Sequence, residues 1–279
     1  MQKENLILSQ KNSKPIVLDV TYKKDGTKKP IVIFCHGYKG FKDWGCWNLL
    51  AEDIVEQNIF FLKFNFSHNG GTVAQPIDFP DLNAFGENNF IKELNDLDAI
   101  LDYITDKKNE FSQQIDITNI TLIGHSRGGG IVLIKAQEDT RVTQVVTLAG
   151  VSDYKVRFPV GEALAHWKKE GVAYIENGRT KQKMPHFIQF YTNFMENEER
   201  LTISRAVRKL DIPYVIIHGT ADETVTLAEA EGLQQWQPKS KLITIENANH
   251  VFGGSHPWEE NSLPNHLQEV ANHIKNFVK

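Results

Sequence analysis

The residues best suited to do chemistry lie in Ile120–Gly129, which reads ITLIGHSRGG. Apolar residues lead into the stretch and a second apolar run follows at Ile131, so the pattern predicts a strand, a sharp turn and a helix. Ser126 stands at the turn, and Gly124 and Gly128 on either side leave room for a tight bend. The pattern G-x-S-x-G at such a junction is typical of a nucleophile elbow, although a serine before a helix is also a common N-cap.

A serine hydroxyl becomes an effective nucleophile only when a base lies within hydrogen-bond reach and an acid orients that base. The base should lie in a loop between the last strand and the terminal helix. Of the ten histidines in the sequence, His250 is the candidate that lies there. The acid should follow a strand between the serine and the histidine. Asp222, after the apolar run 214–218, is the preferred candidate. Glu223 and Asp153 are the alternatives, and Asp222 could instead be an ordinary helix N-cap.

Attack on a carbonyl also needs donors for the negative charge that develops on its oxygen. The backbone N–H of Arg127, directly after the serine, is one candidate because the first amides of a helix lack intrahelical partners. The second is expected in the sequence HGYKG at 36–40, which follows an apolar run, and we choose the backbone N–H of Tyr38. The HG pair also fits a plain tight turn, and the two interpretations are compatible.

These residues need a framework of alternating strands and helices to bring them together. Continuous apolar runs predict strands covered on both faces, and apolar residues at helical spacing predict helices between them. The alternation favours an α/β fold with a mostly parallel central sheet and helices on both faces. The expected strands are 15–22, 30–35, 59–66, the run before Ser126, 142–148, 213–218 and 241–245, and the expected helices are 47–57, 90–105, the segment after Ser126 and 263–278.

The stretch 152–210 interrupts this alternation. It shows no obvious strand and mixes aromatic residues with charges, which favours short amphipathic helices. We therefore expect an α/β core in two parts, residues 1–151 and 211–279, with an insertion at 152–210 that forms a lid over the site. The long polar loop 67–89 is expected to form part of the rim of the site.

Composition narrows the range of partners. The 279 residues carry a net charge of −4 with scattered lysines, so we expect no nucleic-acid surface. No apolar run approaches the ~20 residues that cross a bilayer, and the N-terminus has no signal-peptide pattern. Two cysteines do not make a disulfide framework, so a cytoplasmic location is expected. No pair of histidines or cysteines has metal-ligand spacing, so neither a metal nor another cofactor is expected, and the oligomeric state stays open.

Four motifs in this order resemble those of the α/β-hydrolase superfamily: HGYKG at 36–40, GHSRGG at 124–129, HGTAD at 218–222 and ANH at 248–250. Within that superfamily the chain is similar to lidded carboxylesterases, either the feruloyl or cinnamoyl esterase group or the serine aminopeptidase-like group. One segment departs from the D-F-x-G-H-G pattern of those esterases, since residues 63–71 read KFNFSHNGG.

The resemblance implies that Ser126, Asp222 and His250 form a catalytic triad. It also implies that the backbone amides of Tyr38 and Arg127 form the oxyanion hole. We accordingly expect a serine hydrolase that cleaves a small-molecule carboxylic ester through an acyl-enzyme intermediate.

Two alternatives remain open at this point. One is a peptidase or amidase of the same fold, in which Glu87, Glu93 or a lid carboxylate would bind a peptide terminus. The other is a binding module of the same fold that has no catalytic activity.

Overall fold

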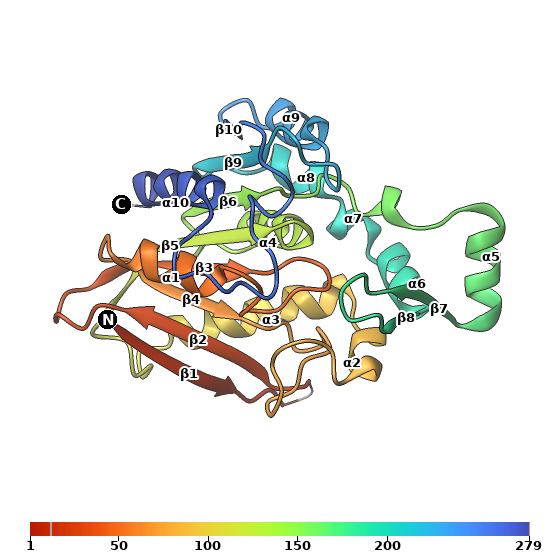
Figure 1. Ribbon diagram of the computed structural model, residues 1–279, viewed down its shortest axis with the longest axis horizontal. Helices are drawn as coiled ribbons and strands as arrows, with labels where there is room; N and C mark the ends of the chain where they lie inside the picture. The colour runs from red at the N-terminus through yellow and green to blue at the C-terminus, as the bar shows by residue number, and fades with distance from the viewer. Residues whose placement is uncertain (12, 279) are drawn as a thin grey trace.

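An eight-stranded sheet forms the centre of the computed structural model, which describes residues 1–11 and 13–278. The strands of the sheet lie in the order β1 (Gln2–Leu8), β2 (Ile16–Tyr22), β4 (Phe60–Phe64), β3 (Lys29–Cys35), β5 (Ile115–His125), β6 (Gln144–Leu148), β9 (Tyr214–Gly219) and β10 (Lys241–Ile245). Strand β2 is antiparallel to both of its neighbours, and the other pairs are parallel. In Figure 1 the sheet runs from β10 at the top to β1 at the bottom.

Helices cover both faces of the sheet and confirm the expected α/β architecture. The pair α1 (Trp47–Val55) and α10 (Asn265–Phe277) contributes to one apolar layer. The opposite layer contains residues of α3 (Phe90–Thr105), α4 (Arg127–Glu138) and α9 (Leu227–Trp236). The short helix α2 (Leu82–Gly86) lies in the long connection between β4 and α3.

Strand β3 shows why a continuous apolar run predicts a central strand. Successive side chains of a strand point to opposite faces of the sheet. Ile31 and Ile33 pack into the layer with α3 and α4, whereas Val32 and Phe34 pack into the layer with α1 and α10. All four side chains are buried, so the strand needs apolar residues at every position rather than at alternate ones.

Two elements of the framework are not anticipated by the sequence patterns. Strand β1 is an edge strand of mostly polar residues, of which Leu6 and Leu8 pack against the core. Helix α9 buries only Ala230 and Leu233, so its apolar periodicity is weak. Contacts with neighbouring elements stabilise β1 and α9 more than their own residue preferences do. Local sequence patterns therefore give little indication of either element.

The chain leaves the sheet after β6 and returns at β9 through an insertion that projects to the right in Figure 1. The insertion contains η1 (Lys155–Arg157), α5 (Gly161–Glu170), β7 (Val172–Glu176), β8 (Lys183–Phe187), α6 (Gln189–Glu196), α7 (Glu198–Leu201) and α8 (Ile203–Arg208). The expectation of short helices is confirmed, but the expectation that no strand occurs here is wrong. Strands β7 and β8 have five residues each and pair only with one another, so neither carries the buried apolar run of a central strand.

Four charged side chains, three of them buried and Asp43 partly buried, fix the loop that follows β3. The ammonium of Lys63 on β4 lies 2.5 Å from carboxylate oxygens of both Asp19 and Asp43. The ammonium of Lys42 lies 2.7 Å from Asp19 and 2.5 Å from Asp43. Two cations alternating with two anions compensate one another, as buried charges require. The cluster therefore ties residues 42 and 43 to β2 and β4, close to the sequence HGYKG.

The carboxyl end of β9 packs directly against the loop that carries His250. The N–H of Ala221 donates to the carbonyl of Ala248 at 3.0 Å, and the N–H of Thr220 donates to Ile245 at 3.0 Å. A Cβ atom at Gly219 would lie 2.1 Å from the carbonyl oxygen of Ala248. This close approach brings the segments of Asp222 and His250 side by side.

Substitution of Gly219 tests that approach. We expect Gly219→Ala to lower the free energy of unfolding by about 3 kcal/mol, because its methyl group meets a backbone carbonyl that has no room to move. The matched control is Gly232→Ala on α9, where nothing lies within 4 Å of the added Cβ. We expect the control to gain about 0.5–1 kcal/mol from its helix propensity. Urea denaturation measures both values, and equal stabilities of the two variants would contradict the close approach.

Candidate active site

Ser126 lies at the strained turn between β5 and α4. Its backbone angles are φ 54° and ψ −120°, a combination that residues with a Cβ rarely adopt. A Cβ at Gly124 would lie 2.2 Å from the carbonyl oxygen of Gly128. One at Gly128 would lie 2.6 Å from the carbonyl oxygens of Cys35 and His36. Both glycines are therefore required by contacts across the turn, in the way that the G-x-S-x-G pattern indicates.

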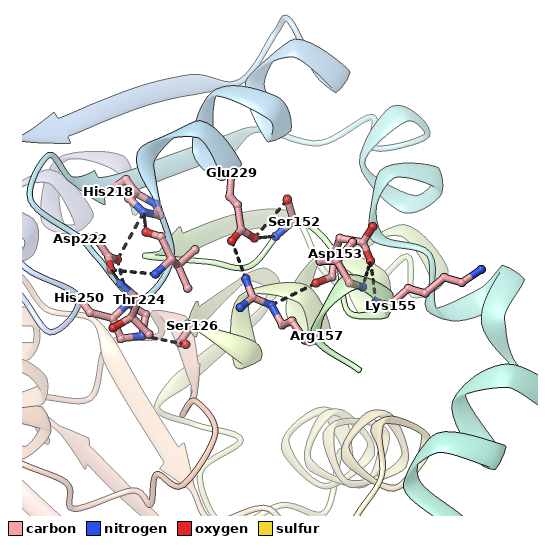
Figure 2. Close-up of polar contacts among 12 residues, drawn as sticks. Ser126, Ser152, Asp153, Lys155, Arg157, His218, Asp222, Thr224, Glu229 and His250 are labelled. Atoms are coloured by element: carbon pink, nitrogen blue, oxygen red, sulfur yellow. Dashed lines mark hydrogen bonds and ion pairs between the residues drawn. The ribbon is translucent and has the colours of Figure 1, made fainter. Parts of the chain in front are cut away.

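The three residues proposed as a triad lie within hydrogen-bond distance of one another. The Nε2 atom of His250 is 2.9 Å from the hydroxyl oxygen of Ser126, and its Nδ1 atom is 2.8 Å from Oδ2 of Asp222 (Figure 2). A neutral imidazole that donates from Nδ1 to the carboxylate has a free electron pair on Nε2 for the serine proton. The arrangement can therefore move a proton from the hydroxyl to the imidazole.

Asp222 is held as an anion in this position. Its Oδ1 accepts hydrogen bonds of 2.9 Å from the backbone N–H groups of Thr224 and Val225. Burial raises its pKa, but hydrogen bonds from His218, His250 and the backbone outweigh that effect and hold the pKa well below its ordinary value. The carboxylate therefore stays ionised at neutral pH and can stabilise an imidazolium.

The two alternative acids do not reach His250 in the structure. Glu223 is exposed, while Asp222 beside it is buried. Asp153 accepts a hydrogen bond of 2.6 Å from the N–H of Lys155, as an ordinary turn residue. The geometry thus favours Asp222 among the three candidates.

Two further histidines, which the sequence patterns do not mark as part of the site, contact Asp222 and the backbone of His250. His218 on β9 lies 3.4 Å from Oδ2 of Asp222, and its Nε2 donates to the carbonyl of Val225 at 2.7 Å. His125 donates from Nε2 to the carbonyl of His250 at 2.9 Å. Burial lowers the pKa of His125 to about 3, so its ring stays neutral and serves as a hydrogen-bond donor to the loop.

The expected oxyanion donors lie on two segments that meet at Ser126. The N–H of Arg127 is the first of α4, and the N–H of Tyr38 lies in the turn after β3. Neither amide has a hydrogen-bond partner among the described residues. A Cβ at Gly37 would lie 2.9 Å from the Cβ of Ser126, so the loop passes directly beside the serine. Two unpaired amides beside a nucleophile are the arrangement that binds a developing oxyanion.

His36 sets the shape of this loop. Its Nδ1 donates to the carbonyl of Gly37 at 2.8 Å, and its Nε2 accepts a hydrogen bond from the N–H of Phe66 at 3.3 Å. Burial lowers the pKa of His36 to about 4, which keeps Nε2 unprotonated and able to accept. The imidazole thus ties the turn after β3 to the end of β4.

The side chains of Tyr38 and Arg127 both contact the insertion. The hydroxyl of Tyr38 lies 2.8 Å from Nε2 of His186 on β8. The guanidinium of Arg127 stacks over Phe190 of α6 at 4.9 Å and forms an ion pair of 2.9 Å with the buried Glu93. Glu93 is therefore occupied by Arg127, so the sequence-based alternative in which it binds a peptide terminus has no support here.

Two cavities meet at Ser126. The larger, of about 850 Å³, lies beneath the insertion and is mostly apolar. The smaller, of about 510 Å³, lies on the other side of the serine and contains His250. The larger cavity is lined among others by Phe90, Tyr154, Phe158, Trp167 and Phe190, and the smaller among others by Lys39, Trp44, Arg179 and His256. Glu87, the second carboxylate suggested for a peptide terminus, lines neither cavity.

Residues 1–11 and 13–278 contain no group of three or more histidine, cysteine, aspartate or glutamate side chains that could hold a metal ion. Over the same residues, no helix has both the length and the apolar character needed to cross a membrane.

The chain matches the model of a known protein family. The BD-FAE family model matches residues 18–237, which is most of the chain. The chain belongs to the BD-FAE family. The family match includes Ser126 and Asp222 and ends before His250, so the place of His250 in the site rests on its distances to the other two residues.

Solved structures share the fold along their whole length. Est1E from Butyrivibrio proteoclasticus with bound ferulic acid is 19% identical, with a TM-score of 0.71 over 98% of this chain and 97% of that chain. The esterase domain of a Rhodothermus marinus protein is 18% identical, with a TM-score of 0.65 over 99% and 98%. Mouse alpha/beta hydrolase domain-containing protein 10 is 17% identical, with a TM-score of 0.69 over 99% and 98%. This BD-FAE family member thus has the α/β-hydrolase fold that its motifs indicate.

The strain at Ser126 can be measured without its hydroxyl. We expect Ser126→Gly to have a free energy of unfolding about 1 kcal/mol higher than Ser126→Ala, because glycine adopts positive φ without a steric penalty. Both variants lack the hydroxyl, so the difference in urea denaturation compares the steric cost of the positive φ with the smaller losses that glycine brings in packing and in chain entropy. A glycine variant that is no more stable than the alanine variant would show that the turn is not strained.

Proposed function

We propose that the protein is a serine hydrolase that cleaves carboxylic esters of small molecules through an acyl-enzyme intermediate. The observation that carries this proposal is the continuous relay from Ser126 through His250 to Asp222, with distances of 2.9 and 2.8 Å. Membership of the BD-FAE family and the similarity to solved esterases support it.

The reaction follows from the position of each group. Ser126 Oγ attacks the carbonyl carbon of the ester while Nε2 of His250 takes the hydroxyl proton. Asp222 stabilises the imidazolium, and the amides of Tyr38 and Arg127 donate to the oxyanion. His250 returns the proton to the alcohol oxygen as the ester C–O bond breaks. Water then attacks the acyl-enzyme with His250 again as base, which releases the acid and restores the serine.

The larger cavity is the proposed site of the acyl group. The departing alcohol must lie within reach of His250, and His250 lines the smaller cavity but not the larger one. The larger cavity offers aromatic walls from both the core and the insertion, which suit an apolar or aromatic acyl group. By analogy with the ferulic acid in Est1E, a hydroxycinnamoyl group is a reasonable occupant.

One charged residue on the wall of this cavity is already neutralised. Arg157 forms an ion pair of 2.6 Å with Glu229, which also accepts hydrogen bonds from Ser152 (Figure 2). The ion pair places polar groups on a mostly apolar wall and adds no net charge to it. An uncharged acyl group with a polar substituent therefore fits this cavity better than an anionic one.

We infer that the insertion acts as a lid. Its residues form one wall of the acyl cavity, and its His186 and Phe190 contact the two oxyanion residues. A cover of this kind keeps water from the acyl cavity and strengthens hydrogen bonds to the oxyanion.

Two alternative functions, a peptidase and a non-catalytic binding module, have less support from the same geometry. Binding of a peptide amine needs an unpaired carboxylate, and no aspartate or glutamate lines either cavity among the described residues. A binding module has no need of an assembled relay with two unpaired amides beside it.

The relay predicts graded losses of ester turnover. We expect Ser126→Ala and His250→Ala to lower kcat by about 10⁴ or more, and Asp222→Asn to lower it by less. A fluorophosphonate probe should label the wild type and leave Ser126→Ala unlabelled, with thermal unfolding as the check that each variant folds. Near-normal turnover in His250→Ala would remove His250 from the mechanism, and a folded wild type that resists labelling would favour the binding module.

The shape of the acyl cavity predicts substrate preference. Among p-nitrophenyl esters we expect kcat/KM to rise from acetyl to butanoyl and cinnamoyl groups, because larger apolar groups fill more of the cavity at roughly 0.8 kcal/mol per buried methylene. Aminoacyl p-nitroanilides should be poor substrates. A preference for the anilides would support the peptidase instead, and a preference for acetyl esters would show that the acyl group lies elsewhere.

A further inference from the structure

The smaller cavity at Ser126 must hold the departing alcohol if the proposed function is correct. His250 gives its proton to the alcohol oxygen, so that oxygen has to lie beside His250 Nε2. Both Ser126 and His250 line this cavity, which has a volume of about 510 Å³. The character of its walls therefore decides which alcohols are accepted.

Three separate segments bring nitrogen-containing side chains to these walls. Lys39 comes from the loop after β3, Arg179 from the turn between β7 and β8, and His256 from the segment after His250. No aspartate or glutamate lines the cavity among the described residues. The chain as a whole carries a net charge of −4, so a wall with several nitrogen-containing side chains and no carboxylate is a local feature.

Lys39 is the decisive residue because its charge has no counter-ion. No carboxylate of a described residue forms an ion pair with its ammonium, which lies 5.2 Å from the centre of the Tyr38 ring. Burial lowers the pKa of Lys39, which is the effect expected for a half-buried ammonium without an anionic partner. By contrast, Arg179 already forms an ion pair with Asp78.

His256 adds a neutral donor to the same wall. Its Nδ1 accepts a hydrogen bond of 2.9 Å from the N–H of Gly45, so the proton of the neutral ring resides on Nε2. Burial lowers the pKa of His256, in keeping with a neutral ring. An ammonium without a counter-ion and a further N–H group are complementary to the oxygens of an anion.

We propose that this cavity selects esters whose alcohol portion carries an anionic group, a carboxylate or a phosphate, with Lys39 as the main specificity-determining residue. The proposal rests on the proposed function, since it assigns the alcohol side of the same reaction. The incoming anion supplies the partner that Lys39 lacks. The acyl cavity stays without net charge because its two arginines, Arg127 and Arg157, are paired with Glu93 and Glu229. The two sides of the ester are thus recognised by opposite chemistry.

Three esters with the same butanoyl group test this assignment. Their alcohols are 4-hydroxybenzoate, 4-hydroxybenzamide and 4-hydroxyphenyl phosphate, which present a carboxylate, a neutral isostere and a phosphate. Each kcat/KM is divided by the rate of alkaline hydrolysis of the same ester, so that leaving-group reactivity cancels. We expect the wild type to prefer at least one anionic ester over the carboxamide by about tenfold, equivalent to 1.4 kcal/mol, and which anion is preferred distinguishes the carboxylate from the phosphate.

Variants connect the preference to the cavity. Lys39→Gln should reduce the ratio of normalised kcat/KM for the anionic ester to that for the neutral ester to nearly one. Lys39→Arg should retain most of this ratio. Lys168→Gln on α5 is the matched control, because it removes an exposed lysine of the insertion that lines neither cavity, and it should leave the ratio unchanged. Added NaCl should lower the wild-type ratio by screening, and this measurement keeps the test valid if Lys39→Gln folds poorly.

The outcomes separate this inference from the proposed function. Hydrolysis of the neutral ester with an anionic-to-neutral ratio of one or less would overturn the inference and leave the esterase proposal intact. An equal fall of the ratio in Lys39→Gln and Lys168→Gln would also overturn it. Failure of the wild type to hydrolyse any of the three esters would overturn the proposed function and the inference together.

Discussion

The backbone at Ser126 is the constraint on which the rest of the site depends. Ser126 has a positive φ although it carries a Cβ, and the glycines on either side leave room for the close contacts of this turn: Gly124 with the carbonyl of Gly128, and Gly128 with the end of β3. The turn exposes the hydroxyl at the end of β5 and starts α4 immediately afterwards. The first amide of α4 therefore lies beside the Ser126 hydroxyl, so in the proposed mechanism one strained residue positions both the attacking group and one of the two oxyanion donors.

Neutral histidines hold the remaining loops against this turn. His36 joins the loop of Tyr38 to the end of β4, and His125 joins the elbow to the backbone of His250. Burial lowers the pKa of both rings, so they form hydrogen bonds without adding charge beside the relay.

The two cavities that meet at Ser126 differ in character, one being mostly apolar and the other lined by nitrogen-containing side chains. In the proposed mechanism, an ester at Ser126 places its acyl side among aromatic residues beneath the insertion and its alcohol side between His250 and the side chains of Lys39, Arg179 and His256. The insertion contributes to both, because β8 and α6 face the acyl cavity while the turn before β8 carries Arg179 to the other. A single segment can therefore influence both halves of substrate recognition.

The sequence by itself determines the α/β framework and marks the residue types of the site. Apolar runs and helical spacing mark most of the sheet and α3, and the spacing of Ser126, Asp222 and His250 singles them out because each follows a strand end. Only the tertiary structure decides that His218 supports Asp222, that Glu93 is taken by Arg127, and that the insertion contains a hairpin. The reason is physical: local patterns report which face of an element is buried, whereas contacts between loops depend on how distant elements pack. The convergence of Lys39, Arg179 and His256 is of this second kind, since nothing in the sequence near any one of them indicates the others.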